Sequence, residues 1–390
     1  MRAPHSIDEL LELMVGRGAS DLHVTAGTPP AIRVRGHVSR LEEFAPLDPE
    51  ATRQLLYQIL NTEQQKRFEV NRQLDFSHTV PGARFRVNVY MQRKSVGAAF
   101  RLIPETVKTL QELGLPGSLA ALAQKPRGLV LVTGPTGSGK STTLAAMIDE
   151  VNRTRHEHIL TIEDPIEFVH WHKGCIVNQR EIGVDALSFA EALRGALRQD
   201  PDVILVGEMR DLETIAIALT AAETGHLVLG TLHTQSASST IDRVIDVFPA
   251  EQQEQVRIQL AGALQGVITQ ALLPTADGTG RVAALEILLP DDAVRNLVRQ
   301  GKVEQVYSVM QTSTARGMQT MEQALADLVS RRVITFETAL GVTSKPDQLR
   351  GVLERAGFPV PAAVPDAAPG SSPPLAGDGV LGGGLRLAGG

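Results

Sequence analysis

The chain has 390 residues, of which 43% are hydrophobic and 21% charged, and its formal net charge is −6. This length favours two or three compact units of ordinary globular composition, each with its own core. The acidic balance gives no overall basic field for nucleic acid or anionic lipid, and no apolar run approaches the roughly 18 residues that cross a bilayer. We therefore expect no nucleic-acid partner and no direct membrane insertion.

The N-terminal sequence and the single cysteine give information on the cellular compartment of the protein. Asp8, Glu9 and Glu12 interrupt the first apolar pattern, and the basic start and unbroken apolar run of a secretory signal are missing. We therefore expect a cytoplasmic protein. Cys175 cannot form an intrachain disulfide, and a lone cysteine is more often a small buried hydrophobic residue than a nucleophile.

Residues 1–105 predict a small α+β domain. Ser6 precedes a helix over 7–15, whose apolar positions follow helical spacing. One further helix is expected over about 51–70. Short strands, several of them alternating, surround it at 21–25, 31–35, 74–79, 84–90 and 96–101.

Residues 126–290, after a linker over 106–125, predict an α/β core. Bare apolar runs alternate there with helical stretches, a pattern typical of a parallel sheet covered on both faces. The expected strands are 128–133, 159–162, 203–206 and 226–231. Residues 291–358 predict a mainly helical region, and the Pro/Gly-rich segment 359–390 predicts a disordered tail.

A glycine-rich segment directly after the strand 128–133 matches the P-loop pattern. Its glycines let backbone N–H groups curl around phosphates, its lysine reaches the β- and γ-phosphates, and its serine ligates Mg²⁺. The sequence therefore predicts ATP and Mg²⁺ as cofactors. The predicted phosphate-binding residues are Gly134, Pro135, Thr136, Gly137, Ser138, Gly139, Lys140, Ser141 and Thr142.

Acidic and histidine side chains stand at the ends of later strands. Glu163 and Glu208 each follow an apolar strand at its carboxyl end, where α/β sheets present residues to their ligands. Either carboxylate alone could instead cap the next helix. His226 and His233 bracket another strand, and we expect His226 to bind the nucleotide and His233 to contact the γ-phosphate, although a lone histidine at a strand end is usually a surface residue.

In order and spacing, these segments resemble the Walker A, Asp, Walker B and His boxes of the type II/type IV secretion ATPase superfamily. Within it, the sequences at 18–23, 84–88, 207–211 and 293–300 resemble the PilT-type branch of pilus retraction ATPases. Relatives usually end the last of these motifs in Glu, where this chain has Gln300.

The resemblance implies a PAS-like N-terminal domain, a RecA-like ATPase domain and a homohexamer that powers type IV pilus retraction and twitching motility. It also implies work with the pilus machinery through an inner-membrane platform protein. Glu163 would be the general base, and Glu208 and Ser141 would hold Mg²⁺ directly or through water. Arg84, Arg86 and Arg101 would reach a neighbouring subunit's nucleotide.

Other functions stay open from the sequence. A pilus-extension or type II secretion assembly ATPase would usually carry a longer N-terminal region and a four-cysteine zinc module, which one cysteine cannot form. A non-hydrolysing ATP-binding ring adaptor fits poorly with intact Lys140, Ser141, Glu163 and Glu208. A helicase lacks support because aromatic residues make up only 4% and offer no clear stacking track.

Overall fold

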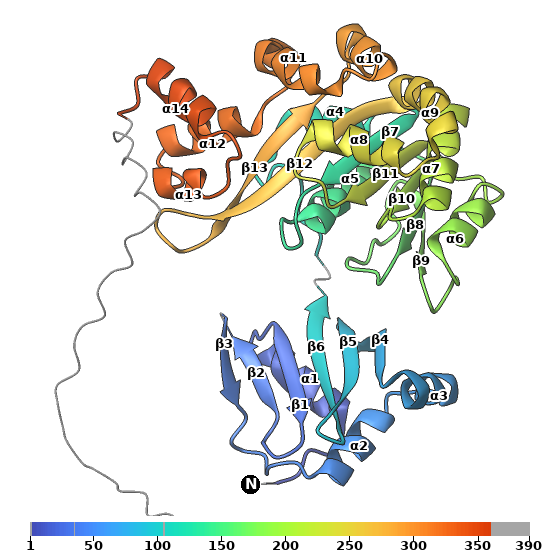
Figure 1. Cartoon of the computed structure of the whole chain (residues 1–390). Coiled ribbons are helices and arrows are strands. Elements are labelled where there is room, and N and C mark those ends of the chain that lie inside the picture. The colour runs from blue at the N-terminus through green and yellow to red at the C-terminus, as the bar shows by residue number, and fades with distance from the viewer. Residues whose placement is uncertain (1, 35, 104–105, 360–390) are drawn as a thin grey trace, which may run out of the picture.

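The computed structural model describes residues 2–34, 36–103 and 106–359. It contains a six-stranded and a seven-stranded sheet, which we call the N-terminal and the C-terminal sheet (Figure 1). Among the described residues, no helix has both the length and the apolar character needed to span a bilayer. The tail predicted to be disordered lies, from residue 360 onward, outside the described residues.

The N-terminal sheet is antiparallel, with strand order β3-β2-β1-β6-β5-β4. Side chains alternate along its long strands, so that one face joins a hydrophobic core with the flanking helices. The strands are β1 (Asp21–Thr25), β2 (Ala31–Val34), β3 (His37–Arg40), β4 (Gln73–Val80), β5 (Ala83–Gln92) and β6 (Ser95–Ile103). The helices are α1 (Ile7–Gly16), α2 (Pro49–Tyr57) and α3 (Thr62–Asn71).

Two details of this region differ from the prediction. The single helix expected over 51–70 is wrong, because Asn61 starts a new helix there. Its side chain accepts from the backbone of Gln64 while the Gln64 side chain accepts from the backbone of Asn61, and this capping box opens α3. Strand β3 was not predicted because all its residues are exposed and it has no apolar pattern.

The C-terminal sheet has the order β13-β12-β7-β11-β10-β8-β9 and is parallel except between β12 and β13. Every residue of its three central strands β7, β11 and β10 is buried, which explains their bare apolar sequences. The strands are β7 (Gly128–Thr133), β8 (His158–Glu163), β9 (Ile176–Glu181), β10 (Val203–Val206), β11 (Leu227–Leu232), β12 (Leu264–Pro274) and β13 (Arg281–Leu288).

Three of these strands, β9, β12 and β13, were not predicted. β9 is an edge strand with a mixed burial pattern. β12 begins at Leu264 directly after a helix that ends at Ala263, so that no turn residue marks the boundary. Sequence patterns identify the sheet centre more readily than its edges, because only the central strands are apolar throughout.

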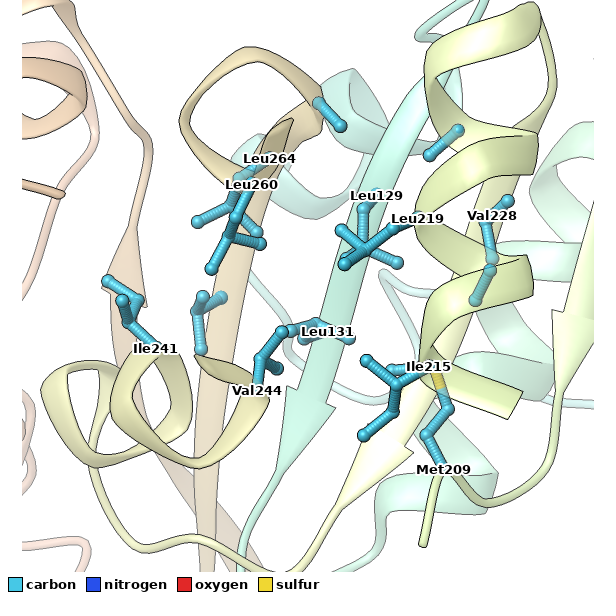
Figure 2. Packing of buried hydrophobic residues seen from close by; sticks show 14 of the residues in the cluster. Leu129, Leu131, Met209, Ile215, Leu219, Val228, Ile241, Val244, Leu260 and Leu264 are labelled. Atoms are coloured by element: carbon cyan, nitrogen blue, oxygen red, sulfur yellow. The ribbon is translucent and has the colours of Figure 1, made fainter. Parts of the chain in front are cut away.

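Helices cover both faces of the C-terminal sheet. Figure 2 shows one side, where Leu129 and Leu131 of β7 pack against the helices α7, α8 and α9. On the other side, Val130 and Val132 pack in a core with α4 and α5. The covering helices are α4 (Gly117–Ala123), α5 (Lys140–Thr154), α6 (Phe189–Ala196), α7 (Leu212–Thr224), α8 (Ala237–Asp246) and α9 (Ala250–Ala263).

Beyond β13, the described residues form helices and no strand, as the sequence predicts. They are α10 (Asp292–Arg299), α11 (Val306–Thr312), α12 (Met321–Ser330), α13 (Phe336–Leu340) and α14 (Pro346–Arg355), with short 3₁₀ turns η1 (Val303–Gln305) and η2 (Thr314–Arg316). The segment 106–125, predicted as a linker, carries α4, whose Leu119 and Leu122 are buried in the core with α5. The domain limits proposed from the sequence stay predictions.

Candidate nucleotide site

The segment with the P-loop pattern connects β7 to α5. Gly134 and Gly139 adopt φ angles of 136° and 90°, which favour glycine. A Cβ atom on Gly134 would lie 2.3 Å from the carbonyl oxygen of Gln270 on β12, so this close approach also requires glycine. The loop runs straight into α5, whose first N–H groups lack intrahelical partners. Curled backbone and a helix N-terminus together suit an anionic ligand.

Ser138 and Lys140 have surroundings that fit a phosphate. Ser138 is 3% exposed, and its hydroxyl makes no hydrogen bond within the described residues. Lys140 Nζ donates to the carbonyl oxygens of Gly134 and Pro135 at 2.9 and 3.0 Å. Burial lowers the pKa of Lys140, against the opposing charges of Glu208 and Glu167. A bound oxyanion would give the orphaned hydroxyl an acceptor and the ammonium a charged partner.

Glu163 ends β8 as a buried carboxylate. Its Oε1 accepts from Thr161 Oγ1 at 2.6 Å and from Gln179 Nε2 at 3.2 Å, and its Oε2 accepts from the backbone of Glu167 at 3.4 Å. Burial raises the pKa of Glu163 to about 7, although the hydrogen bonds from Thr161 and Gln179 oppose this rise. A carboxylate with a pKa near neutrality is suited to accept a proton from a reacting group.

Glu208 lies just beyond β10 and keeps a charged carboxylate. Its Oε1 accepts from His233 Nε2 at 2.8 Å and from Arg210 Nε. Burial on its own would raise the pKa of Glu208, but the Arg210 hydrogen bond and charge, with His233 adding to them, lower it overall. His233 itself follows β11, the strand between β7 and β10. Glu208 therefore presents negative charge at the same edge of the sheet as the glycine-rich loop.

One cavity of about 170 Å³ joins these groups. It lies at the carboxyl ends of parallel strands, where α/β sheets bind their ligands. The predicted site residues that line it are Thr136, Gly137, Lys140, Ser141, Glu163, Glu208 and His233. The structure thus brings the predicted phosphate, base and metal-binding positions around one space. This arrangement can hold a phosphate chain between cationic and acidic groups.

Comparison with known proteins agrees with this geometry. The family described as "Type II/IV secretion system protein" matches residues 4–279. The type IV pilus retractation ATPase PilT of Pseudomonas aeruginosa is 58% identical over 334 residues, which cover 85% of this chain and 96% of that protein. The chain is a PilT-type member of the type II/IV secretion ATPases.

Two further relatives support the assignment to PilT-type ATPases. A twitching motility protein of Neisseria gonorrhoeae is 54% identical over 311 residues, covering 80% of this chain and 83% of that protein. The crystal structure of the pilus retraction motor PilT with bound ADP superposes with a TM-score of 0.84 at 52% identity, covering 89% of this chain and all of that one. The predicted family and the mixed α/β fold class are confirmed.

His226 lies apart from the other predicted residues of this PilT-type site. It precedes β11, whereas His233 follows the same strand, so the two histidines stand at opposite edges of the sheet. The His226 ring contacts the carbonyl oxygen of Ala221 through Nδ1 at 3.0 Å and does not line the cavity. Within the described chain, His226 makes a structural contact at the end of α7, and its contact with nucleotide stays a prediction.

The three predicted arginines share one face of the N-terminal sheet. Arg84 and Arg86 alternate with buried residues along β5. In the strand register Arg86 lies directly opposite Arg101 of β6, which places their side chains on the same face. The sequence spacing predicted that Arg84 and Arg86 lie on the same face, and the strand register places Arg101 on that face as well. None of the three lines the cavity formed with Glu163 and Glu208.

The side chains of the three predicted arginines have different hydrogen-bond and ion-pair partners. Arg101 Nε donates to Asp21 Oδ1 at 2.8 Å. Arg84 Nη2 contacts Glu181 at the end of β9 at 3.0 Å, so it connects the two sheets. The exposed side chain of Arg86 makes no hydrogen bond or ion pair with any described residue. Of the three arginines, Arg86 is therefore the one that can pair with a group outside this chain without first breaking a contact to a described residue.

Sequence reasoning missed several residues that support the site. Gln179 of β9 donates to Glu163, and Gln270 of β12 accepts from Thr143 Oγ1 of α5 at 2.8 Å. His170 also lines the cavity, with a buried Nδ1 that has no partner among the described residues, and burial lowers its pKa to about 4. No local pattern marks these positions, because sheet order brings Gln179 and Gln270 to the site and His170 reaches it from the loop between β8 and β9.

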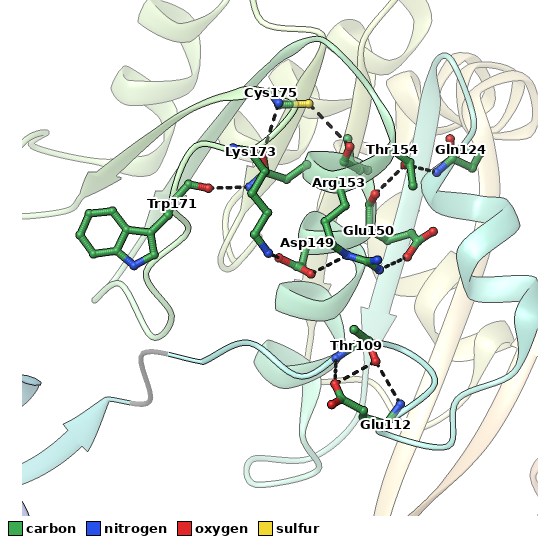
Figure 3. A network of polar contacts seen from close by, with 12 residues as sticks. Thr109, Glu112, Gln124, Asp149, Glu150, Arg153, Thr154, Trp171, Lys173 and Cys175 are labelled. Carbon is green, nitrogen blue, oxygen red and sulfur yellow. Dashed lines mark hydrogen bonds and ion pairs between the residues drawn. The ribbon is translucent and has the colours of Figure 1, made fainter. Parts of the chain in front are cut away.

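The loop after Glu163 is tied to α5 by the polar contacts in Figure 3. Lys173 pairs with Asp149, and Asn152 Nδ2 donates to the carbonyl oxygen of Trp171 at 2.7 Å. Cys175 is buried, with its thiol near the carbonyl oxygen of Arg155 at 3.3 Å, as expected for a small hydrophobic residue with a weak donor. The indole of Trp171 points away from these contacts and is exposed.

Proposed function

We propose that this chain forms a hexameric ring that hydrolyses ATP and powers type IV pilus retraction and twitching motility. The observation that carries the proposal is the single cavity in which Lys140, Glu163, Glu208 and His233 meet. The high identity to PilT along nearly the whole of that protein supports retraction as the task. We further propose that the ring works in the cytoplasm, at the inner membrane, through the pilus machinery and its platform protein.

The geometry supports a division of chemical roles. Lys140 and the backbone of the glycine-rich loop bind the β- and γ-phosphates of ATP, and His233 contacts the γ-phosphate. Ser141 and Glu208 would hold Mg²⁺, directly or through water, and the ion would neutralise charge on the phosphates. Glu163 accepts the proton of the attacking water. With a pKa of about 7, part of the carboxylate is ionised near neutral pH, and it is basic enough to take up a proton.

A second cavity of about 590 Å³ opens on the other side of the glycine-rich loop. Its lining combines apolar residues such as Pro135 and Met310 with polar and charged residues such as Ser138, Glu286 and Lys345. We propose that the nucleoside part of ATP lies here, because a triphosphate held by the loop must place its ribose and base beside it. Val342→Trp, at an exposed residue of the same lining, should then raise the KM for ATP at least about 10-fold while pyrophosphate binding stays unchanged.

The direction of force is tested in cells. We expect deletion to leave many surface pili and to abolish surface movement, because a retraction motor removes pilus subunits. Restoring the wild-type chain should restore movement, whereas Lys140→Ala should not. Bald cells after deletion would contradict retraction and favour an extension or secretion ATPase. A purified ring that binds ATP without turnover would instead favour an adaptor.

A further inference from the structure

Glu181 joins the N-terminal sheet to the loop that carries the proposed base. It ends the edge strand β9, and its side chain is 3% exposed. One oxygen, Oε2, accepts from Arg84 Nη2 at 3.0 Å and from the backbone N–H of Ile166 at 3.2 Å. A single buried carboxylate oxygen therefore touches both the N-terminal sheet and the loop after Glu163.

The position of Ile166 makes this contact relevant to catalysis. Ile166 follows Asp164 and Pro165, which come directly after Glu163. Glu163 and Glu181 are also paired in the register of β8 and β9, and the backbone of Ile182 donates to the Glu163 carbonyl at 2.8 Å. Glu181 thus fixes the turn beyond Glu163, while the strand pairing fixes the residue itself.

Arg84 supplies the charge that this buried carboxylate needs. An unpaired buried carboxylate is costly, so Glu181 holds its position only with a cation beside it. Arg84 Nη2 also donates to Ser77 Oγ at 2.8 Å, but Arg84 Nε is buried without a partner among the described residues. The guanidinium is thus held by one nitrogen instead of the two-point contact that makes arginine pairs strongest. Such a contact can be released when the sheets move apart.

We propose that Arg84 and Glu181 form a latch within one chain, and that both are positioning residues for Glu163. The proposal rests on the ATP hydrolysis proposed above. With the latch closed, Glu181 holds the Ile166 N–H and keeps Glu163 aimed at the attacking water. With the latch open, the turn loosens and hydrolysis slows while ATP still binds. Arg84 then makes hydrolysis depend on the position of the N-terminal sheet of its own chain. A donated arginine would instead act on the nucleotide of a neighbouring subunit.

Substitutions at the two positions test the latch. We expect Arg84→Ala and Glu181→Gln each to lower kcat about 10-fold with little change in the Kd for ATP. The reciprocal variant carrying Arg84→Glu and Glu181→Arg should regain part of that loss, as should Arg84→Lys. Arg67→Ala is the matched control, because Arg67 of α3 donates to the carbonyl oxygen of Gly183, just beyond β9, and so also connects the N-terminal region to the C-terminal one without touching Glu181. It should keep near wild-type kcat.

Mixed rings separate a latch from a donated arginine. Rings that combine Arg84→Ala with Lys140→Ala subunits should be no more active per Arg84→Ala subunit than rings of Arg84→Ala alone, because each chain then lacks either its own latch or its own phosphate lysine. Recovery of activity in such rings would overturn the latch and make Arg84 a donated residue. Wild-type kcat in Arg84→Ala would also overturn it. An inactive wild-type ring would instead refute the proposed hydrolysis.

Discussion

The two sheets present their functional side chains in different ways. In the C-terminal sheet, Lys140, Glu163, Glu208 and His233 lie at adjacent strand ends and meet around one cavity of the same chain. In the N-terminal sheet, the predicted arginines share one face, and none of them lines that cavity. Their roles therefore depend on side-chain partners: Arg101 pairs with Asp21, Arg84 pairs with Glu181, and the Arg86 side chain pairs with none of the described residues.

This difference separates two kinds of functional residue. A site at the edge of a parallel sheet is complete within one fold, because the strands bring their ends together. The role of an arginine on a sheet face depends on the surface that packs against that face. Substitutions in the C-terminal sheet should therefore act inside each subunit. Those at Arg86 should act across the ring, and those at Arg84 should act within the chain.

The largest expected effect belongs to the phosphate lysine. Lys140→Ala removes the charge that faces the β- and γ-phosphates, so ATP affinity should fall by at least about 100-fold. Titration with a fluorescent ATP analogue measures it, and Lys125→Ala at an exposed position just after α4 provides a lysine control. Wild-type affinity in Lys140→Ala would show that the glycine-rich loop is not the nucleotide site.

Glu163→Gln should separate binding from chemistry within the same sheet. The amide keeps the shape of the side chain but cannot accept a proton, so ATP should bind normally while kcat falls by roughly 100-fold or more. Single-turnover measurements with saturating ATP test this. If turnover is unchanged, the base role passes to another carboxylate, with Glu208 the first to examine.

The contrast between the sheets also explains what sequence alone could predict. The glycine-rich loop and the strand-end residues Glu163 and Glu208 were located because each stands next to its own strand in the chain. Gln270 and Glu181 were not, because they lie on β12 and β9, which reach the site only through the order of strands in the sheet. For Arg84, the sequence indicated the face but could not indicate its buried partner.

Arg86 provides the sharpest test of action across the ring. Arg86→Ala rings should assemble and bind ATP but hydrolyse it at least about 10-fold more slowly, since an arginine near the γ-phosphate stabilises transition-state charge. Mixing them with Lys140→Ala subunits should restore some activity, because one interface can then combine an intact lysine with an intact arginine. The control Arg101→Ala should cost little, because Arg101 is exposed and already paired with Asp21.

No recovery at any mixing ratio would contradict a donated Arg86 and make it a structural residue. Equal losses in Arg86→Ala and Arg101→Ala would contradict the distinction drawn from their partners. Recovery with Arg86→Ala but not with Arg84→Ala would place the two neighbours on β5 in different roles. Melting temperatures of Arg86→Ala and Arg101→Ala should stay close to that of the wild type, as expected for exposed side chains, whereas Arg84→Ala should melt at a lower temperature because it leaves the buried Glu181 carboxylate without its cation.

The last expected effect concerns stability instead of activity and follows from burial, which distinguishes Glu163 from the exposed Arg86 and Arg101. Its folded-state pKa of about 7 exceeds the ordinary 4.5, so the folded state binds its proton more tightly than the unfolded state. This contribution to stability is therefore fully present below pH 4.5 and is lost as the pH rises through about 7, with a size of about 3 kcal/mol. Glu163→Gln should remove that dependence, so the variant should gain stability relative to wild type between pH 5 and pH 8 in urea unfolding.

Glu208→Gln should show the opposite sign, because the pKa of Glu208 is lowered and its contribution is lost as the pH falls. The same pH slope in Glu163→Gln and wild type would mean that Glu163 is ionised as readily in the folded state as in the unfolded chain, and its role as a neutral-pH base would lose its physical support.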